Sequence, residues 1–141
     1  MKTFLPDVNV WVALASEDHQ HYAVARDWFA GRQAGSVVFN RVTLMSFLRY
    51  LTNQRVMADN VHTVQSAWDF LQILLSDDRV LFVQEPETVD SAWIALMQLP
   101  SVGPSSWTDA YLAAFAIESN SELVTFDRKF SRWSRLSLTL L

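Results

Sequence analysis

Residues 108–127 read Thr-Asp-Ala-Tyr-Leu-Ala-Ala-Phe-Ala-Ile-Glu-Ser-Asn-Ser-Glu-Leu-Val-Thr-Phe-Asp, and within this segment the pattern changes from helix to strand. The part from Thr108 to Ser119 is rich in alanine and predicts a helix. Leu123 to Phe126 is a short run of apolar and β-branched residues bounded by polar ones, which is typical of a strand. A helix that leads directly into a strand is the repeating unit of a parallel α/β sheet.

The rest of the chain repeats this alternation. We expect further strands at residues 3–5, 36–39, 80–83 and 137–141, and helices at residues 8–15, 21–30, 43–51 and 89–97. A longer helix should run from Asp59 or Asn60 to about Leu75 and bury Val64, Ala67, Trp68, Leu71 and Leu75. No repeat or Pro/Gly-rich linker interrupts the pattern, so we expect one α/β domain over residues 1–141. It would have three layers, with a short, mostly parallel central sheet of four to five strands and helices on both faces.

Composition excludes several classes of protein. Half of the 141 residues are apolar and 13% are aromatic, which supplies a buried core and argues against disorder. Cysteine is absent, which excludes disulfides, thiolate metal sites and cysteine nucleophiles. No run approaches the roughly 20 apolar residues of a membrane span. The segment Met1 to Asp7 lacks the apolar region of a signal peptide, so we expect a cytoplasmic protein with no membrane contact.

The net charge of −4 is unevenly distributed. Acids gather in pairs such as Glu17-Asp18 and Asp77-Asp78, whereas four bases and no acid fall in residues 128–135. A metal-dependent nuclease needs acids at its centre and bases only around the rim, so a mildly acidic chain remains compatible with a nucleic-acid partner. The candidates for phosphate contacts are Arg41, Arg49, Arg128, Lys129, Arg132 and Arg135.

Three aspartates fall where a parallel α/β sheet places its ligands. Asp7 follows the first expected strand, Asp127 follows the strand at 123–126, and Asp109 lies in the first turn of the helix that leads into that strand. Ligands bind beyond the carboxyl ends of such strands. Close carboxylates repel one another unless a cation neutralises them, and hard oxygen ligands suit magnesium or manganese. Each aspartate also has a simpler interpretation, because Asp commonly caps turns and helix N-termini.

Other chemistry has weaker support. His19, His21 and His62 are scattered, and the chain contains no Gly-x-Ser-x-Gly nucleophile motif or glycine-rich phosphate loop. Trp11, Trp28, Trp68 and Trp93 fall on apolar helical stripes and are expected in the core. Trp107 and Trp133 lie nearer the aspartates, and for them packing and base stacking both remain open.

Four segments resemble the PIN-domain ribonuclease toxins of the VapC type from VapBC toxin–antitoxin pairs. They are Phe4-Leu5-Pro6-Asp7-Val8-Asn9-Val10, Ser46-Phe47-Leu48-Arg49-Tyr50-Leu51-Thr52-Asn53, Thr108-Asp109-Ala110-Tyr111-Leu112-Ala113-Ala114 and Leu123-Val124-Thr125-Phe126-Asp127-Arg128-Lys129-Phe130. The resemblance implies an endoribonuclease that depends on Mg²⁺ or Mn²⁺, forms a homodimer and is inhibited by a VapB-type antitoxin. It assigns Asp7, Asp109 and Asp127 as catalytic acids and metal ligands, with Asn9, Thr108 and Thr125 as supporting residues.

The sequence departs from the family pattern at one place. PIN nucleases usually carry a further acid in or just before the helix that follows the second strand, but residues 43–47 read Thr-Leu-Met-Ser-Phe. This leaves open whether one metal or two are bound, and whether Glu87 or Asp90 substitutes. An alternative is a catalytically impaired PIN-fold protein that acts by dimerisation and antitoxin binding. A phosphoryl enzyme that uses an aspartate is a weaker alternative, since Asp7-Val8-Asn9 supplies only half of its Asp-x-Asp motif.

Overall fold

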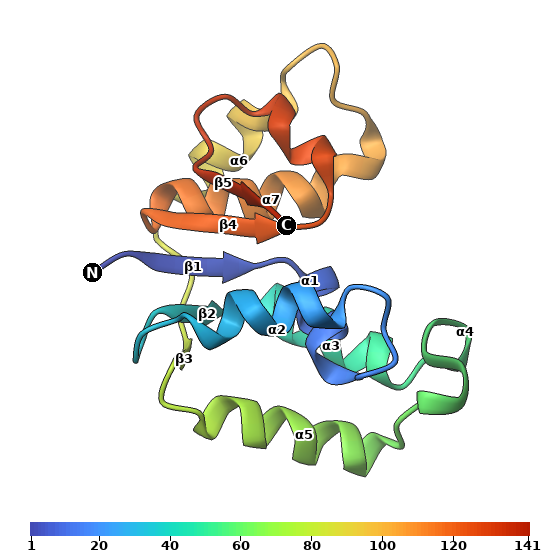
Figure 1. Ribbon diagram of the computed structural model, residues 1–141. Coiled ribbons are helices and arrows are strands. Elements are labelled where there is room, and N and C mark those ends of the chain that lie inside the picture. Colours follow the sequence, from blue (N-terminus) through green and yellow to red (C-terminus); the bar gives the residue numbers. More distant parts are fainter.

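Five parallel strands form the centre of the molecule. The computed structural model describes residues 1–141 and orders the strands β3-β2-β1-β4-β5 (Figure 1). All four pairings between neighbours are parallel, so the expected mostly parallel sheet is entirely parallel. The strands are β1 (Thr3–Pro6), β2 (Val37–Phe39), β3 (Val80–Phe82), β4 (Ser121–Thr125) and β5 (Leu138–Leu140).

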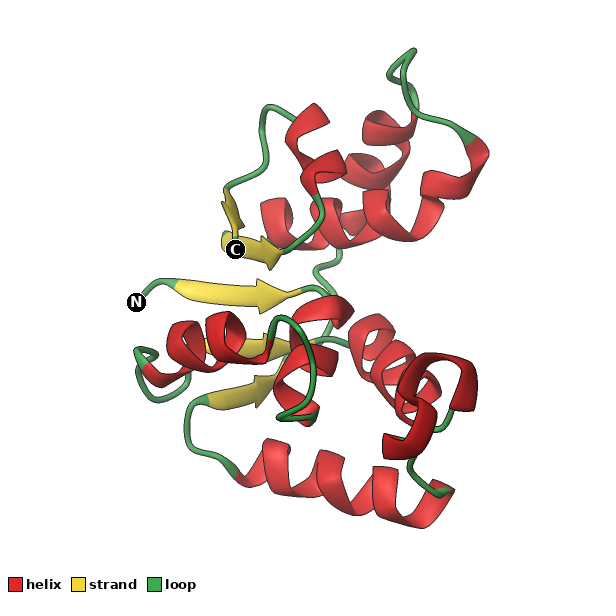
Figure 2. Cartoon of the chain, turned by 45° about the vertical axis from the view of Figure 1, so that its right-hand side comes forward, coloured by secondary structure: helices red, strands yellow, loops and turns green.

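Helices cover both faces of the sheet, as the alternating pattern predicts (Figure 2). One face packs against α6 and α7, and the other against α1, α2, α3 and α5. Short 3-10 helices, η1 (Ala58–Asn60), η2 (Pro104–Ser106) and η3 (Arg128–Arg132), join the longer elements. The helices are α1 (Val8–Ala15), α2 (Tyr22–Ala30), α3 (Arg41–Leu51), α4 (Gln54–Met57), α5 (Val64–Ser76), α6 (Val89–Met97) and α7 (Trp107–Glu118).

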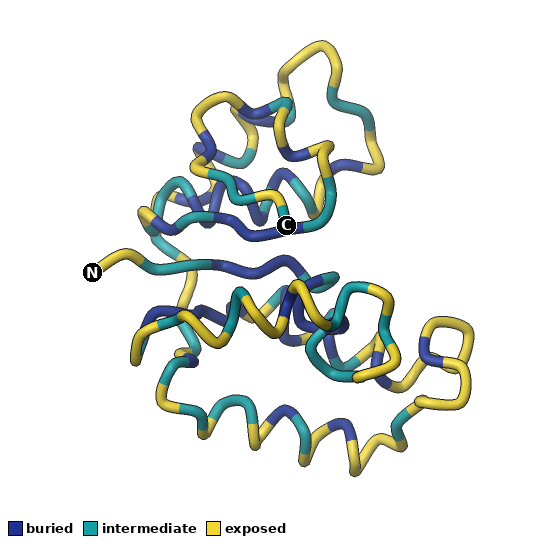
Figure 3. Tube along the Cα trace, in the orientation of Figure 1, coloured by how far each residue is buried: buried dark blue, intermediate teal, exposed yellow.

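Alternating side chains of the central strands enter the two cores. Leu5 and Leu123 are fully buried among α6 and α7, while Val37 and Phe39 are fully buried on the opposite face. Trp11 of α1 stacks on Phe39 with ring centroids 3.9 Å apart, so this expected core tryptophan is confirmed. Figure 3 shows the buried residues running along β1 and β4 in the middle of the molecule.

The register of β1 and β4 places the candidate acids at one edge. Leu5 pairs with Leu123 and Pro6 with Val124, and the Asp7 backbone N–H donates to the Val124 carbonyl at 2.8 Å. Both strands therefore end at the same level. Residues that follow them, including Asp7 and Asp127, lie together beyond the carboxyl edge of the sheet.

Helix α5 differs from the expectation in its start and in its buried face. It begins at Val64, because the Thr63 side chain accepts from the Ser66 N–H, while residues 54–60 form α4 and η1 instead. Ala67 and Leu71 face the core, but Val64 is 81% exposed and Trp68 is 50% exposed. The expected burial of Val64 and Trp68 is therefore wrong: Val64 lies in the first turn and Trp68 lies beside the buried seam of Ala67 and Leu71.

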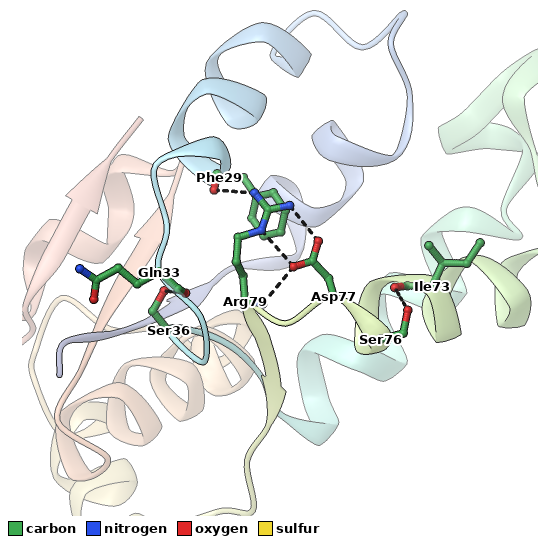
Figure 4. A network of polar contacts seen from close by, with 7 residues as sticks. All are labelled: Phe29, Gln33, Ser36, Ile73, Ser76, Asp77 and Arg79. Carbon is green, nitrogen blue, oxygen red and sulfur yellow. Dashed lines mark hydrogen bonds and ion pairs between the residues drawn. The ribbon is translucent and has the colours of Figure 1, made fainter.

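An ion pair braces the amino edge of the sheet, at the turn between α5 and β3 (Figure 4). Arg79 donates through Nε and Nη2 to the two carboxylate oxygens of Asp77, at 3.0 and 2.8 Å, and through Nη1 to the Phe29 carbonyl at 3.3 Å. The arginine also lies over the Phe29 ring. One turn is thereby fastened to the end of α2.

No helix in the structure has the length and apolar character needed to cross a membrane.

The structure separates the two tryptophans for which packing and base stacking were both open. Trp133 is 2% exposed and belongs to the core, whereas Trp107 is 46% exposed.

Candidate active site

The Thr125 hydroxyl connects three of the residues singled out in the sequence. Thr125 is the last residue of β4 and is fully buried. Its Oγ1 donates to Asp7 Oδ2 at 3.0 Å and accepts from Asn9 Nδ2 at 3.2 Å. It also accepts from the Asp127 backbone N–H at 3.0 Å. One side chain of β4 therefore holds the end of β1, the first turn of α1 and the turn after β4 in a fixed arrangement.

Asp7 is both a helix cap and a wall of a cavity. Its Oδ1 accepts from the Val8 N–H at 2.7 Å, which caps α1. The capping role proposed as the simpler interpretation is thus real, yet the same carboxylate lines a cavity of about 450 Å³ together with Asp109. The other lining residues are Val8, Val42, Thr43, Ser46, Arg49, Tyr50, Asn53, Thr108 and Leu112.

The carboxylates of Asp7 and Asp109, which line this cavity (the aspartate cavity), are not fully neutralised by nearby positive charges. Burial raises the pKa of Asp7 to about 6, against the lowering effect of hydrogen bonds from Thr125 and Val8, and the charges of Asp109 and Asp127 raise it further. Burial also raises the pKa of Asp109, as does the charge of Asp127, while Arg132 and Lys129 act in the opposite direction. A buried carboxylate near others of its kind is the arrangement that a bound cation stabilises.

The chemistry of these donors suits a hard divalent ion, which prefers carboxylate oxygen and keeps several waters. No group of three or more acidic or histidine side chains lies close enough to hold a metal ion in the present arrangement. Asp7 and Asp109 share the cavity, and Asp127 acts on both through its charge while its Oδ1 caps η3 by accepting from the Lys129 N–H at 2.9 Å. The donor set therefore fits an ion held by two carboxylates, with water or phosphate at its remaining positions.

The basic candidates divide into three groups by position. Arg49 lines the aspartate cavity, whereas Arg41 lines a neighbouring one. The charges of Lys129 and Arg132 act on Asp109, and Arg132 Nη2 also donates to Ser106 Oγ at 2.9 Å. Arg128 and Arg135 are exposed on the surface.

Helix α3 supplies a polar wall, of which only Arg49 had been predicted. Ser46, Arg49 and Tyr50 of α3 line the cavity, at spacings of three and four residues from Ser46, and Asn53, which caps the following helix α4, also lines it. Such spacing puts side chains on one face of a helix, so a polar stripe within an otherwise apolar helix was the available signal.

No carboxylate from α3 enters the cavity, because that wall presents the hydroxyls of Thr43 and Ser46. Glu87 and Asp90, considered above as substitutes, do not line it. The charge of Asp90 acts instead on Tyr111.

Comparison with known proteins relates the chain to a known family. The PIN domain family model matches residues 4–136. The chain is 38% identical to Ribonuclease VapC41 of Mycobacterium tuberculosis over 142 aligned residues, which cover 97% of each protein. It is also 33% identical to Ribonuclease VapC43 of the same organism over 96 residues, 66% of this chain and 63% of that one.

Solved structures share the fold at low sequence identity. The sarcin–ricin loop cleaving toxin VapC20 of M. tuberculosis superposes with a TM-score of 0.68 at 20% identity, over 92% of this chain and 94% of that one. VapBC2 from Rickettsia felis, bound to a promoter DNA fragment, gives 0.71 at 15% identity over 99% and 98%. The family match along nearly the whole chain and the close VapC41 relative together show that this protein belongs to the PIN-domain family, in its VapC branch.

Proposed function

We propose that this chain is a metal-dependent endoribonuclease and the toxin of a type II toxin–antitoxin pair, acting in the cytoplasm as a single domain of residues 1–141. The observation that carries the proposal is the cavity shared by Asp7 and Asp109 at the carboxyl edge of the sheet, where burial and mutual repulsion leave negative charge without a partner. The relative VapC41, 38% identical over 97% of the chain, is a ribonuclease by name.

The three acids have two roles in the proposed reaction. Asp7 and Asp109 would hold a Mg²⁺ or Mn²⁺ ion, and Thr125 orients Asp7 by donating to its Oδ2. Asp127 accepts the proton of the attacking water. The water oxygen bonds to phosphorus as the bond to the 3′ oxygen breaks, and the departing 3′ oxygen takes a proton from solvent, which leaves a 5′-phosphate and a 3′-hydroxyl. When bound, the ion would supply Lewis acidity to the phosphate and lower the pKa of a water.

The basic residues hold the RNA backbone around this centre. Arg49 contacts a phosphate from inside the aspartate cavity, and Arg41, Arg128, Lys129 and Arg132 extend the positive surface beyond it. Thr108 and Asn9 support the acids, the first from the cavity wall and the second through Thr125.

The partners in this proposal are a VapB-type antitoxin and a second copy of the chain. Solved proteins with the same fold include a toxin–antitoxin complex from Klebsiella pneumoniae. Large apolar side chains exposed on α5 and α3, among them Val64, Trp68, Ile73 and Met45, provide surface for such contacts.

One observation favours the alternative of a catalytically impaired, antitoxin-binding protein. The α3 wall of the cavity offers hydroxyls in place of the acid usual in the family. A weaker ion site would then leave only the binding role.

Cleavage of total cellular RNA with magnesium, manganese or EDTA separates the two functions. The 5′ ends of the fragments should be sequenced, and calorimetry should measure metal binding to the same preparation. We expect fragments with 5′-phosphates at defined sites, formed only with metal and not by Asp7→Asn. Metal binding and cleavage both absent from the wild-type protein would refute the nuclease and leave the impaired binding protein.

A further inference from the structure

A second cavity, of about 460 Å³, adjoins the aspartate cavity. The two share the lining residues Val42 and Thr108, so they lie next to each other at the start of α3 and of α7. Trp107, at the first position of α7, lines the second cavity, while Asp109, two residues later, lines the first. A ligand that reaches Asp109 therefore has a neighbouring space into which its next group extends.

Aromatic side chains form a fixed wall in this second cavity. Trp93 Nε1 donates to the Trp107 carbonyl at 2.9 Å, and the two indole rings meet edge to face with centroids 5.6 Å apart. Tyr111 packs against Trp93 at 5.3 Å and donates its hydroxyl to Glu85 Oε2 at 2.5 Å. Trp93 and Tyr111 are thus held by hydrogen bonds within the chain. Trp107 still exposes 46% of its surface.

A positive charge without an acidic partner lies at the same cavity. The ion pairs of the chain are Lys2 with Glu122, Arg26 with Asp27 and Arg79 with Asp77, and none includes Arg41. The Arg41 guanidinium lies 4.6 Å from the centroid of the Phe82 ring and lines the cavity beside the aromatic wall. It is available to an anion that approaches from the aspartate side.

We propose that the second cavity binds one unpaired nucleobase of the RNA substrate, stacked on Trp107, with an adjoining phosphate on Arg41. An exposed indole beside a free guanidinium is the combination with which proteins hold single-stranded nucleic acid. The free lone pairs of Glu85 accept from N–H groups at the edge of the base. Base stacking requires a single strand, so the cavity selects loops and unpaired segments over duplex. This inference rests on the proposed function, since it places the base next to the phosphate at Asp109.

Binding of single-stranded RNA tests this subsite without any turnover. The probes are fluorescein-labelled ten-nucleotide oligomers of adenylate and of uridylate, measured by anisotropy across a salt series in EDTA. All proteins carry Asp7→Asn, which removes one repelling charge and, with EDTA, prevents cleavage. The added variants are Trp107→Ala, Trp107→Phe, Arg41→Gln and, as a control at an equally exposed apolar side chain on α2, Val24→Ala. Thermal melting followed by circular dichroism verifies that each variant is folded.

Each variant has its own expected result. Trp107→Ala should weaken binding about tenfold and leave the salt dependence unchanged, since stacking contributes about 1–3 kcal/mol per base and releases no counterion. Trp107→Phe keeps an aromatic face and should lose less than about threefold. Arg41→Gln should lower the slope of log Kd against log salt by about 0.7, the value for one phosphate of a single strand. Val24→Ala should bind like its parent.

Several outcomes would overturn the subsite. Among them are unchanged binding in Trp107→Ala, equal losses in Trp107→Phe and Trp107→Ala, a loss as large in Val24→Ala, and no binding of either oligomer by the parent protein. A separate assay of wild-type cleavage with magnesium tests the nuclease itself, so failure of the proposed function and failure of the subsite are distinguishable.

Discussion

Asp7 and Asp77 are the same residue type in opposite electrostatic surroundings, at opposite edges of the sheet. Asp77 lies just before β3, and the Arg79 side chain lowers its pKa to about 2. Asp7 lies just after β1, and burial raises its pKa to about 6 despite two hydrogen bonds. Asp77 is neutralised within the chain and fastens a turn. Asp7 is held in place by the fold without a countercharge, which is the condition expected of an acid reserved for a ligand.

The largest expected effect of this contrast is on catalysis. Asp7→Asn should lower the rate of metal-dependent RNA cleavage on the order of 100-fold or more, because it removes a proposed ion ligand from the aspartate cavity. Asp77→Asn, the matched substitution at the neutralised acid, should change the rate by less than about twofold. Initial rates on a defined RNA at saturating magnesium measure both. Equal losses of cleavage rate in Asp7→Asn and Asp77→Asn would mean that the electrostatic difference between the two acids has no bearing on catalysis.

The same contrast predicts opposite pH dependences of stability for the protein in EDTA. The pKa of Asp7 is raised by folding, so its burial costs most above about pH 6, and the cost disappears as the pH falls towards 4. The pKa of Asp77 is lowered by folding, so its contribution is present above about pH 4 and is lost as the pH falls towards 2.

Urea denaturation from pH 2 to 8 measures these contributions. At pH 7, Asp7→Asn should raise the free energy of unfolding by about 2 kcal/mol, and Asp77→Asn should lower it by about 1–2 kcal/mol. The first variant should also flatten the profile between pH 4 and 7, and the second below pH 4. A lower free energy of unfolding for Asp7→Asn than for the wild type at pH 7 would contradict the prediction that the buried Asp7 carboxylate destabilises the fold.

A smaller effect is expected at Thr125, through which Asp7 is positioned. Thr125→Val keeps the shape but removes a buried hydroxyl that makes three hydrogen bonds, to Asp7, Asn9 and the Asp127 N–H. We expect a loss of about 1–2 kcal/mol in unfolding free energy, and cleavage about tenfold slower. Thr125→Ser retains the hydroxyl and should recover most of the rate. A serine variant as slow as the valine variant would point to packing of the methyl group instead.

The smallest effect is expected at Arg49, which lines the aspartate cavity. Arg49→Ala should raise the KM for RNA by a few fold and reduce the salt dependence of binding by about 0.7 in log–log slope, with little change in kcat. Arg26→Ala, at an arginine that is paired with Asp27 on α2, is the control and should behave like wild type. A fall in kcat with an unchanged KM would move Arg49 from substrate binding to the chemical step.

Local sequence predicted the elements that carry the acids. The apolar runs before Asp7 and Asp127 become β1 and β4, and the alanine-rich segment becomes α7, because in each the hydrophobic pattern agrees with the tertiary environment. The pattern failed around residues 54–64. There two short helical turns precede α5, and the Thr63 cap gives no signal that separates it from Asp59 or Asn60.

The sequence could not predict the contacts between segments that are far apart along the chain. Thr125 bonds to residues 116 and 118 positions away, and nothing local to β4 indicates that its hydroxyl faces Asp7. The exposure of Val64 and Trp68 likewise depends on which face of α5 packs against the rest of the chain, where Ala67 and Leu71 are buried. The metal preference and the participation of Asp127 as a direct ligand stay predictions.

Strand β1 pairs with β4, which lies much later in the sequence, so the order of synthesis determines when the site can form. Asp7 emerges from the ribosome well before the second acid, Asp109, and before its support, Thr125. Until β4 docks, the outer edge of β1 is unpaired and the cavity has no second wall. Translation products that stall before residue 109 therefore lack the second acid and the support of Asp7, and should be harmless to the cell that makes them.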